Sequence, residues 1–334
     1  MTFRSPSSRR QLGLAAFALA ADALLPVTAS AQQFPNKPIR IVVPFTPGGG
    51  NDVFARQMAK SLGELRNQGV VVENKPGAGG NLGTEYVVRS APDGTTLLLG
   101  HSGTVSINPA LYGKLKYDTQ KDLVPVAMFA SSALLLVVPA SSPVKTVADL
   151  VAAAKAGPGK INYASSGSGT GGHLTGEMFG QKCGAKISHI PYKGTAPALT
   201  DLVGGQVQMM FSVIPPALAL VKSGRLRAVA VTGSKRLPSL PDVPTVAEAS
   251  VPGLAKFEST LTYGILAPRG TPEAFVKELS GQMLKVAATE EFQSRLGVEG
   301  AVPLLGGSSE YAALIRKESA QWAEIIKVSG ATVE

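Results

Sequence analysis

Short runs of Val, Ile and Leu alternate with helix-compatible stretches along most of this chain, and this alternation constrains the fold more than any other feature. Runs such as 39–44, 134–138 and 226–231 carry apolar residues without polar alternation. Strands of this kind are buried on both faces, as in parallel sheets covered by crossover helices. The sequence therefore predicts an α/β fold.

The expected strands are each followed by an expected helix. In chain order the strand and helix pairs are 39–44 with 53–65, 70–73 with 81–90, 134–138 with 146–156, 161–164 with 173–181, 187–190 with 196–203, and 207–211 with 216–223. Thr146 and Thr245 open capping boxes, and Thr271 is expected to cap a helix that has Pro272 at its first position. In the last expected helix, 309–328, Trp322 lies on the apolar face and is predicted to be a core residue.

The length and composition suit two domains. The chain has 334 residues, of which 44% are hydrophobic, enough for a large core. Two apolar segments interrupted by small polar residues, 126–138 and 257–267, are predicted to cross between lobes. One α/β domain would then comprise residues 33–130 and 262–334, and the other residues 131–261. Two strands linking two lobes form a hinge over a cleft.

The N-terminus is predicted to be a signal peptide over residues 1–31. Three arginines precede an apolar run at 12–25, and Ala-Ser-Ala at 29–31 has the form of a signal-peptidase site. The mature chain would begin near Gln32 and reach the periplasm through Sec or the twin-arginine route. The apolar run is too short to span a membrane.

Charge and cysteine content exclude several classes of protein. The formal net charge is +9, and removal of the leader's three arginines and one aspartate leaves +7. The basic residues are thinly spread without aromatic neighbours, which argues against nucleic acid as a partner. Cys183 is the single cysteine, so no internal disulfide forms, and we expect it to be a buried apolar residue of a monomer.

Three glycine-rich loops each connect an expected strand to an expected helix. They occupy residues 44–52, 76–83 and 165–173. Ligands of open α/β folds bind at this edge of the sheet, and a helix N-terminus there attracts a carboxylate or phosphate. Glycine admits close approach of the backbone, and Ser and Thr add donors. Tight turns alone are the alternative, but three such loops favour an anion site. Its further candidate contacts are Asn81, His101, Ser102 and Tyr192.

The sequence gives little support for a cofactor or a metal site. The third loop matches a dinucleotide fingerprint at Gly167, Gly169 and Gly172, but the acidic residue expected about 20 positions later is missing. We therefore expect no cofactor. No two histidines have the spacing of a metal site, so no metal is expected either.

An exported hydrolase is the alternative function. It would use a serine in the cleft with His101 or His173 as the base, although no nucleophile-elbow motif occurs. We favour a hydrogen-bonding role at the helix start for His173 and a structural role for His189. Asp52 and Asp201 are expected to brace loops. A binding protein that feeds a sensor remains a third possibility.

Around these loops the sequence resembles the Bug family of extracytoplasmic solute receptors, the binding subunits of tripartite tricarboxylate transporters. The blocks that carry the resemblance are FPNKPIR (34–40), DVFAR (52–56), VVVENKPGAGG (70–80), PDGTTLL (92–98), NPALY (108–112), HIPYKGTAPA (189–198), LPDVPT (240–245) and APRGTP (267–272). Two positions depart from the family pattern. Thr262 stands where the family often has Trp, and residues 65–68 read Leu-Arg-Asn-Gln rather than Leu-Gly-Gln.

The resemblance implies a two-domain periplasmic-binding fold of type II, with α/β lobes that close on a ligand and no catalysis. It implies that the first and third loops hold the carboxylate of a small organic acid or amino acid. It also implies delivery to the membrane subunits of a transporter. Carried over, the ligand-binding positions are Phe45, Thr46, Gly49, Gly50 and Asp52 in the first loop, and Ser165, Gly167, Ser168, Gly169 and Thr170 in the third.

Overall fold

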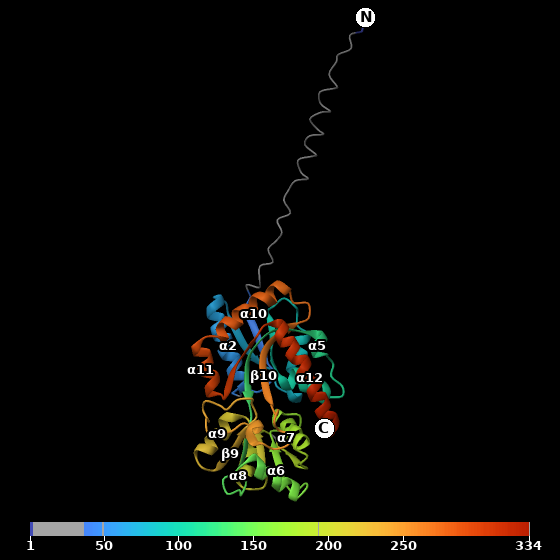
Figure 1. The fold of residues 1–334 in the computed structure, drawn as a ribbon. Helices are drawn as coiled ribbons and strands as arrows, with labels where there is room; N and C mark the ends of the chain where they lie inside the picture. The colour runs from blue at the N-terminus through green and yellow to red at the C-terminus, as the bar shows by residue number, and fades with distance from the viewer. Residues whose placement is uncertain (3–36, 49, 193, 334) are drawn as a thin grey trace. The chain divides into compact units, whose positions relative to one another are not determined.

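The computed structural model describes residues 1–2, 37–48, 50–192 and 194–333. The expected signal peptide and the expected mature start at Gln32 therefore lie outside the described residues, apart from residues 1–2. Pro35–Glu334 form one unit, which contains two α/β lobes, each built on one sheet (Figure 1).

Six strands form the sheet of the first lobe in the described part of the chain, in the order β11-β4-β10-β3-β1-β2. β1 pairs in parallel with β2 and β3, β10 is antiparallel to β3 and β4, and β11 is antiparallel to β4. The strands are β1 (Ile39–Val43), β2 (Val70–Asn74), β3 (Thr96–His101), β4 (Leu123–Ala133), β10 (Thr260–Pro268) and β11 (Ala301–Gly306).

Long helices pack around this sheet, and Figure 1 shows α2, α10, α11 and α12 gathered around β10. They are α2 (Gly50–Arg66), α3 (Asn81–Val88), α10 (Glu273–Ala287), α11 (Glu290–Val298) and α12 (Ser308–Ser329). Short helical turns complete the loops: η2 (Ala78–Gly80), the π-helical η3 (Gly103–Ile107), α4 (Asn108–Leu111) and α5 (Thr119–Asp122).

The sheet of the second lobe has the order β7-β6-β8-β5-β9. Its strands are β5 (Leu135–Pro139), β6 (Asn162–Ser165), β7 (Ser188–Pro191), β8 (Met209–Ser212) and β9 (Leu226–Val231). β6 pairs in parallel with β7 and β8, and β5 is antiparallel to β8 and β9. The helices of this lobe are α6 (Val147–Ala156), α7 (Gly171–Cys183), α8 (Thr195–Val203), α9 (Ile214–Lys222) and η4 (Val246–Ala249).

The expectation of parallel sheets is wrong for about half of the strands. β1–β3 and β6–β8 are parallel, because crossover helices connect them. β4, β5, β9, β10 and β11 are antiparallel to their neighbours. β11 was not expected at all. It is an edge strand that contains Pro303. Proline cannot donate a ladder hydrogen bond, so within sheets it occurs mainly in edge strands, where one side needs no partner.

Local capping signals explain several helix starts. The capping boxes expected at Thr146 and Thr245 are both confirmed, although the second opens the 3-10 turn η4. The expectation for Thr271 is wrong. Its hydroxyl donates to the Pro268 carbonyl at 2.8 Å, and Pro272 itself is the N-cap of α10.

The chain passes between the two sheets at two places that lie together. Leu134 alone separates β4 from β5. The Leu134 amide donates to the Thr232 hydroxyl at 2.8 Å, and that hydroxyl donates to the Ser259 carbonyl, just before β10, at 2.6 Å. The domain boundaries at 130/131 and 261/262 remain predictions.

Each lobe has a buried apolar core between its sheet and its helices. In the first lobe Val42, Leu98 and Leu266 are fully buried, and in the second Leu135, Val137 and Leu202 are. Trp322 is 3% exposed, as predicted for a core residue, and Cys183 is a buried free thiol at the end of α7.

Candidate functional site

Asp52 braces the first glycine loop. Its Oδ2 accepts hydrogen bonds from the Gly48 amide at 3.0 Å and from Arg56 Nε at 2.9 Å, and its Oδ1 accepts one from Asn74 Nδ2 at 2.9 Å. Burial opposes ionisation of this carboxyl, but the three hydrogen bonds outweigh it and hold the pKa of Asp52 below its usual range. The side chain is therefore an anionic support for the loop, as expected from the sequence.

The other first-loop candidates lie around the start of α2. Thr46 is exposed, and Gly50 is partly buried as the first residue of α2. The Phe45 ring makes an edge contact with the His101 ring, with centroids 5.6 Å apart. Gly49 lies outside the described residues. Phe45, Gly50 and His101 are therefore in one region of the first lobe.

Asn81, the candidate in the second loop, is 7% exposed and hydrogen-bonded. Its Oδ1 accepts from Asn108 Nδ2 at 2.7 Å and from the Tyr117 hydroxyl at 2.9 Å. At the preceding residue, Gly80, a Cβ would lie 3.3 Å from the Phe45 ring, so the first and second loops are in contact. Asn81 thus ties the second loop to its neighbours, and its role in ligand binding remains a prediction.

His101 and Ser102 end β3 in a buried setting. His101 Nδ1 accepts a hydrogen bond from the Gly103 amide at 3.0 Å, and burial lowers the His101 pKa to about 4. Ser102 is fully buried, and its hydroxyl accepts from the Thr262 amide at 2.7 Å and donates to Glu318 Oε1 at 3.3 Å. Both side chains already have hydrogen-bond partners within the protein, which favours structural roles over ligand binding.

Glu318 on α12 is the polar residue that the sequence analysis missed. Its carboxylate accepts hydrogen bonds from the hydroxyls of Ser106 at 2.8 Å, Thr262 at 2.9 Å and Ser102. Burial raises the pKa of Glu318, and the three hydroxyls only partly offset this. The residue at the departure from the family pattern, Thr262, therefore takes part in a polar cluster that joins β10, α12 and the segment after β3.

The third loop folds back on itself. The Thr170 hydroxyl donates to the Gly167 carbonyl at 2.7 Å, and the Gly167 amide donates to the Ser165 hydroxyl at 3.1 Å. The Gly169 amide donates to His173 Nδ1 at 3.0 Å, which confirms the helix-start role expected for His173. Ser168 is exposed. Three of the amides carried over as anion donors, those of Gly167, Gly169 and Thr170, are therefore already paired, the last with the Gly167 carbonyl at 3.2 Å.

Tyr192 lies beside the third loop. Its amide donates to the Ser165 carbonyl at 3.0 Å, and its hydroxyl donates to Asp201 Oδ2 at 2.8 Å. Asp201 thus braces this segment, as expected. Whether Tyr192 contacts a ligand remains a prediction.

The N-terminus of α7 lacks an internal cap. Thr170 is the N-cap residue, yet its hydroxyl bonds to the loop rather than to the helix. In the described part of the chain, the amides of Gly171, Gly172 and His173 have no hydrogen-bond acceptor. All three residues are buried. Buried amides at a helix start require an acceptor, and an anion satisfies them best.

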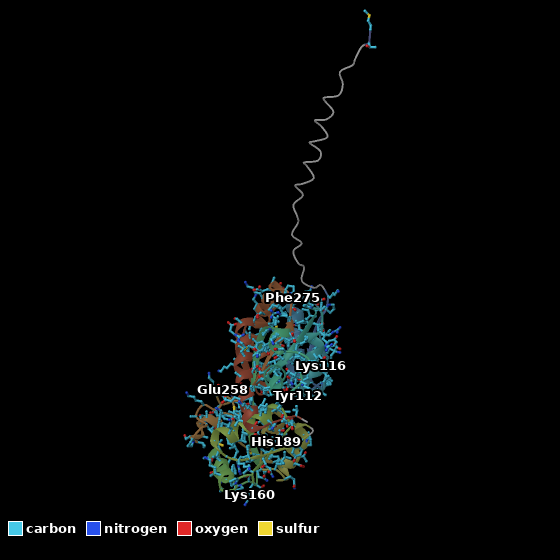
Figure 2. All side chains as sticks on the ribbon, turned by 90° about the vertical axis from the view of Figure 1, so that its right-hand side faces the viewer. Tyr112, Lys116, Lys160, His189, Glu258 and Phe275 are labelled. Carbon is cyan, nitrogen blue, oxygen red and sulfur yellow. The ribbon has the colours of Figure 1, made fainter. Side chains whose placement is uncertain are left out.

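The second and third loops meet the same short helix, α4. Asn108 at its start bonds to Asn81 of the second loop. A Cβ on Gly169 of the third loop would lie 2.4 Å from Leu111 at its end, and one on Gly79 would lie 2.5 Å from the hydroxyl of Tyr112. Figure 2 labels Tyr112 in the first lobe and His189 in the second. The three glycine loops are therefore linked through one contact region.

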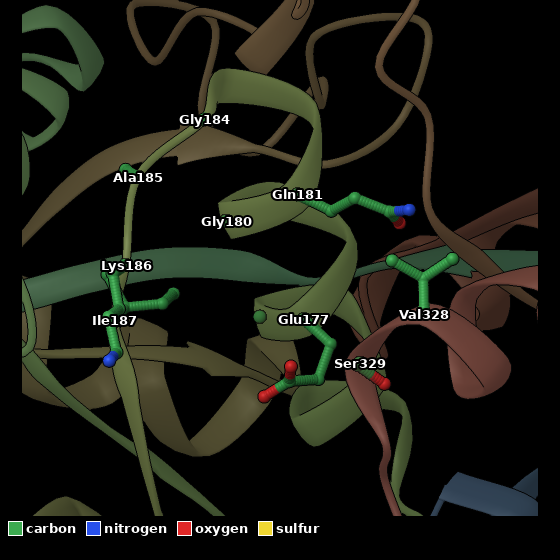
Figure 3. A pocket seen from close by; sticks show the side chains of 10 residues that line it. Glu177, Gly180, Gln181, Gly184, Ala185, Lys186, Ile187, Val328 and Ser329 are labelled. Atoms are coloured by element: carbon green, nitrogen blue, oxygen red, sulfur yellow. The ribbon is translucent and has the colours of Figure 1, made fainter.

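Two pockets are found elsewhere in the described structure. One, of about 480 Å³, lies beside Glu318, Thr262 and Trp322. The other, of about 500 Å³, lies along α7 next to Glu177 and Val328 (Figure 3). Neither is lined by the candidate ligand contacts.

The hydrolase alternative is not supported by the serine and histidine contacts. Ser165 Oγ is hydrogen-bonded to His189 Nε2 at 2.6 Å, a histidine other than the two that this alternative names as the base, and Ser165 is fully buried. Over residues 37–333, gaps aside, no group of three or more His, Cys, Asp or Glu residues is placed to hold a metal ion. Nor does any described helix have the length and apolarity needed to cross a membrane.

Known proteins resemble this chain over most of its length. A family model described as "Tripartite tricarboxylate transporter family receptor" matches residues 54–331. BugT of Bordetella pertussis is 35% identical over 306 residues, which cover 91% of this chain and 93% of BugT.

Solved structures of other proteins are also similar to this chain. The R. palustris protein Rpa4515 with adipate has a TM-score of 0.80 at 35% identity, covering 90% of this chain and 99% of that protein. MatC from Rhodopseudomonas palustris with bound malate has a TM-score of 0.75 at 32% identity, covering 88% and 100%. The family match and these relatives show that this chain belongs to the tripartite tricarboxylate transporter receptor family, whose two-lobed α/β fold it shares.

Proposed function

We propose that this protein captures a small organic carboxylate between its lobes, at the first and third glycine loops, and delivers it to the membrane subunits of a tripartite transporter. The uncapped start of α7 carries the proposal. Gly171, Gly172 and His173 are buried residues at the positive end of a 13-residue helix, and their amides lack an acceptor among the described residues. A carboxylate placed there would accept these hydrogen bonds and gain from the helix dipole.

The relatives support a carboxylate as the ligand. One structural neighbour was solved with adipate and another with malate, both dicarboxylates. BugD, a further neighbour at 35% identity, is described as a periplasmic binding protein. We propose the same compartment for this chain, reached through the signal peptide over residues 1–31. Capture would be reversible and would involve no bond-making step.

A thermal-shift screen tests the proposal. The mature chain from Gln32 would be melted with malate, adipate, succinate and citrate, and with the neutral diamide of adipic acid as the matched control. At one hundred times its dissociation constant, a ligand adds about 2.7 kcal/mol to the free energy of unfolding. For a chain of about 300 residues that corresponds to a rise in Tm of about 4 °C. A shift with the diamide and with none of the acids would refute the proposal.

Thr170→Asp tests the position of the anion. Thr170 has the extended backbone of an N-cap residue, φ −74° and ψ 160°, so an aspartate there would place its own carboxylate on the start of α7. We expect the variant to bind the active acid at least tenfold more weakly while gaining about 0.5–1 kcal/mol of stability without ligand. Thr170→Ser, which keeps the hydroxyl, is the matched control and should bind like the wild type.

A further inference from the structure

A cluster of titratable side chains lies beneath the third glycine loop. Tyr163 of β6, His173 and Glu177 of α7, and His189 of β7 form it. The rings of His173 and His189 are stacked, with centroids 3.8 Å apart and planes inclined by 17°. The Tyr163 hydroxyl donates to Glu177 Oε1 at 2.5 Å, and the Tyr163 ring lies 5.0 Å from the His189 ring. The proposed capture of a carboxylate assigns no role to this stack.

Each imidazole holds one point of the loop. The Gly169 amide donates to His173 Nδ1 at 3.0 Å. Because a backbone amide can only donate, this nitrogen carries no proton. His189 Nε2 is hydrogen-bonded to the hydroxyl of Ser165 at 2.6 Å, and that hydroxyl also accepts from the Gly167 amide. The loop is therefore fixed at both ends by rings that support one another.

We infer that His173 and His189 act as a stacked pair of positioning residues that hold the third glycine loop in its binding shape, and that protonation of the pair releases the loop. A proton on His173 Nδ1 replaces an acceptor by a donor, so the bond from Gly169 must break. Two charged imidazoles at a centroid distance of 3.8 Å also repel each other. The consequence for ligand affinity rests on the proposed function, but the change in the loop does not.

The surroundings keep both rings neutral at ordinary pH. Burial lowers the pKa of His173 to about 4, and burial together with the charge of His173 lowers that of His189 to about 3. Glu177 Oε1, 3.9 Å from His173 Nε2, would favour a charged ring, but burial raises the pKa of Glu177 itself.

Of the described residues that line the pocket beside Glu177, one other carries a charge. Lys186, just before β7, lines the same pocket as Glu177, and Figure 3 shows both side chains there. The pocket-lining residues of α12 are Val328 and Ser329, which carry no charge. In β8, which packs on α7, no residue is charged. The loop should therefore be held above about pH 5 and released as the pH falls through about 4.

Shape-matched variants test the role of His173. His173→Asn places an amide oxygen near the position of Nδ1 and keeps the acceptor, whereas His173→Leu removes it. The first readout is the amide resonance of Gly169 and its hydrogen-exchange protection, measured without ligand. We expect protection to fall about tenfold or more in His173→Leu and to change less than threefold in His173→Asn. In the wild type the resonance should titrate with a midpoint near pH 4, and in His173→Asn it should not follow that titration.

The second readout is the dissociation constant for malate and adipate, by calorimetry at pH 7. Loss of the hydrogen bond should raise it about tenfold in His173→Leu and by less than threefold in His173→Asn. His189→Gln, which keeps a polar atom near Nε2, should bind more tightly than His189→Leu.

The two proposals fail in different ways. Failure of the wild type to bind any carboxylate would refute the proposed function, while the Gly169 measurements would still decide the role of the histidines. Unchanged Gly169 protection in His173→Leu would overturn the positioning role. So would equal losses in His173→Asn and His173→Leu, since an acceptor would then not matter.

Discussion

Glu318 offers a sharp test of the energetics near the crossing strands. Glu318→Ala would leave the hydroxyls of Ser102, Ser106 and Thr262 without their acceptor. Ser102 and Ser106 are fully buried and Thr262 is 2% exposed, so water would reach these hydroxyls only from the pocket beside Glu318. A buried hydroxyl that loses its partner costs about 1–3 kcal/mol. Burying the carboxylate itself costs free energy, which offsets part of the stability that these hydrogen bonds provide. We therefore expect Glu318→Ala to lower the free energy of unfolding by about 2–4 kcal/mol.

The charge state of Glu318 sets the direction of the pH effect. Burial raises its pKa in the folded protein above the unfolded value of about 4.5. Its contribution to stability is then complete below that value and is lost as the pH rises through the folded-state pKa. Glu318→Gln keeps an oxygen acceptor and cannot ionise. Its free energy of unfolding should therefore be within about 1 kcal/mol of the wild-type value near pH 5, and should rise relative to the wild type towards pH 8.

Urea unfolding of the mature chain at pH 5 and pH 8 measures these differences. Glu324→Ala, an exposed glutamate on the same helix, is the matched control and should change stability by less than about 0.5 kcal/mol. If Glu318→Ala were as stable as this control, the hydroxyl cluster would contribute nothing. If the difference between Glu318→Gln and the wild type were the same at both pH values, the carboxyl would not be perturbed by burial.

Three further predictions concern stability alone. The hydroxyl of Tyr311 is buried without a hydrogen-bond partner in the described structure, so Tyr311→Phe should leave the free energy of unfolding unchanged or raise it by up to about 1 kcal/mol; a clear loss in urea unfolding would reveal a partner. Thr146→Ala should cost about 1 kcal/mol by removing the cap of α6, and Thr146→Ser should restore most of it in thermal melts. Burial lowers the His101 pKa to about 4, so its share of stability is complete above about pH 6.5 and is lost as the pH falls towards 4. Between pH 7.5 and pH 5 the free energy of unfolding should therefore fall by about 2 kcal/mol more in the wild type than in His101→Asn, and equal falls would contradict this.

The sequence predicts those features of the fold that depend on short segments. The apolar runs that became β1 and β9, and the capping boxes at Thr146 and Thr245, need only their own neighbours. Whether neighbouring strands are parallel or antiparallel was harder to predict from the sequence. The antiparallel pairing of β10 with β4 joins segments more than 120 residues apart, and apolar composition does not distinguish it from a parallel pairing.

The site residues that could not be predicted from the sequence are held by polar contacts between distant segments of the chain. Glu318 lies 216 residues from Ser102, and a single glutamate on an amphipathic helix gives no sign of being enclosed. His189 meets Ser165 because β6 and β7 pair with Tyr163 opposite His189, a register that no local pattern specifies. The glycine loops were recognisable because glycine spacing is local. Which of their amides were already paired depended on side chains such as His173.

The burial of Cys183 has a practical consequence. It is the chain's only thiol, it is 3% exposed, and it ends the helix that begins at the third glycine loop. Burial also raises its pKa, which suppresses the reactive thiolate. A maleimide dye should therefore attach only during transient opening of α7, without any engineered cysteine. Labelling rates with and without malate or adipate would then report how strongly an occupied site restrains that helix.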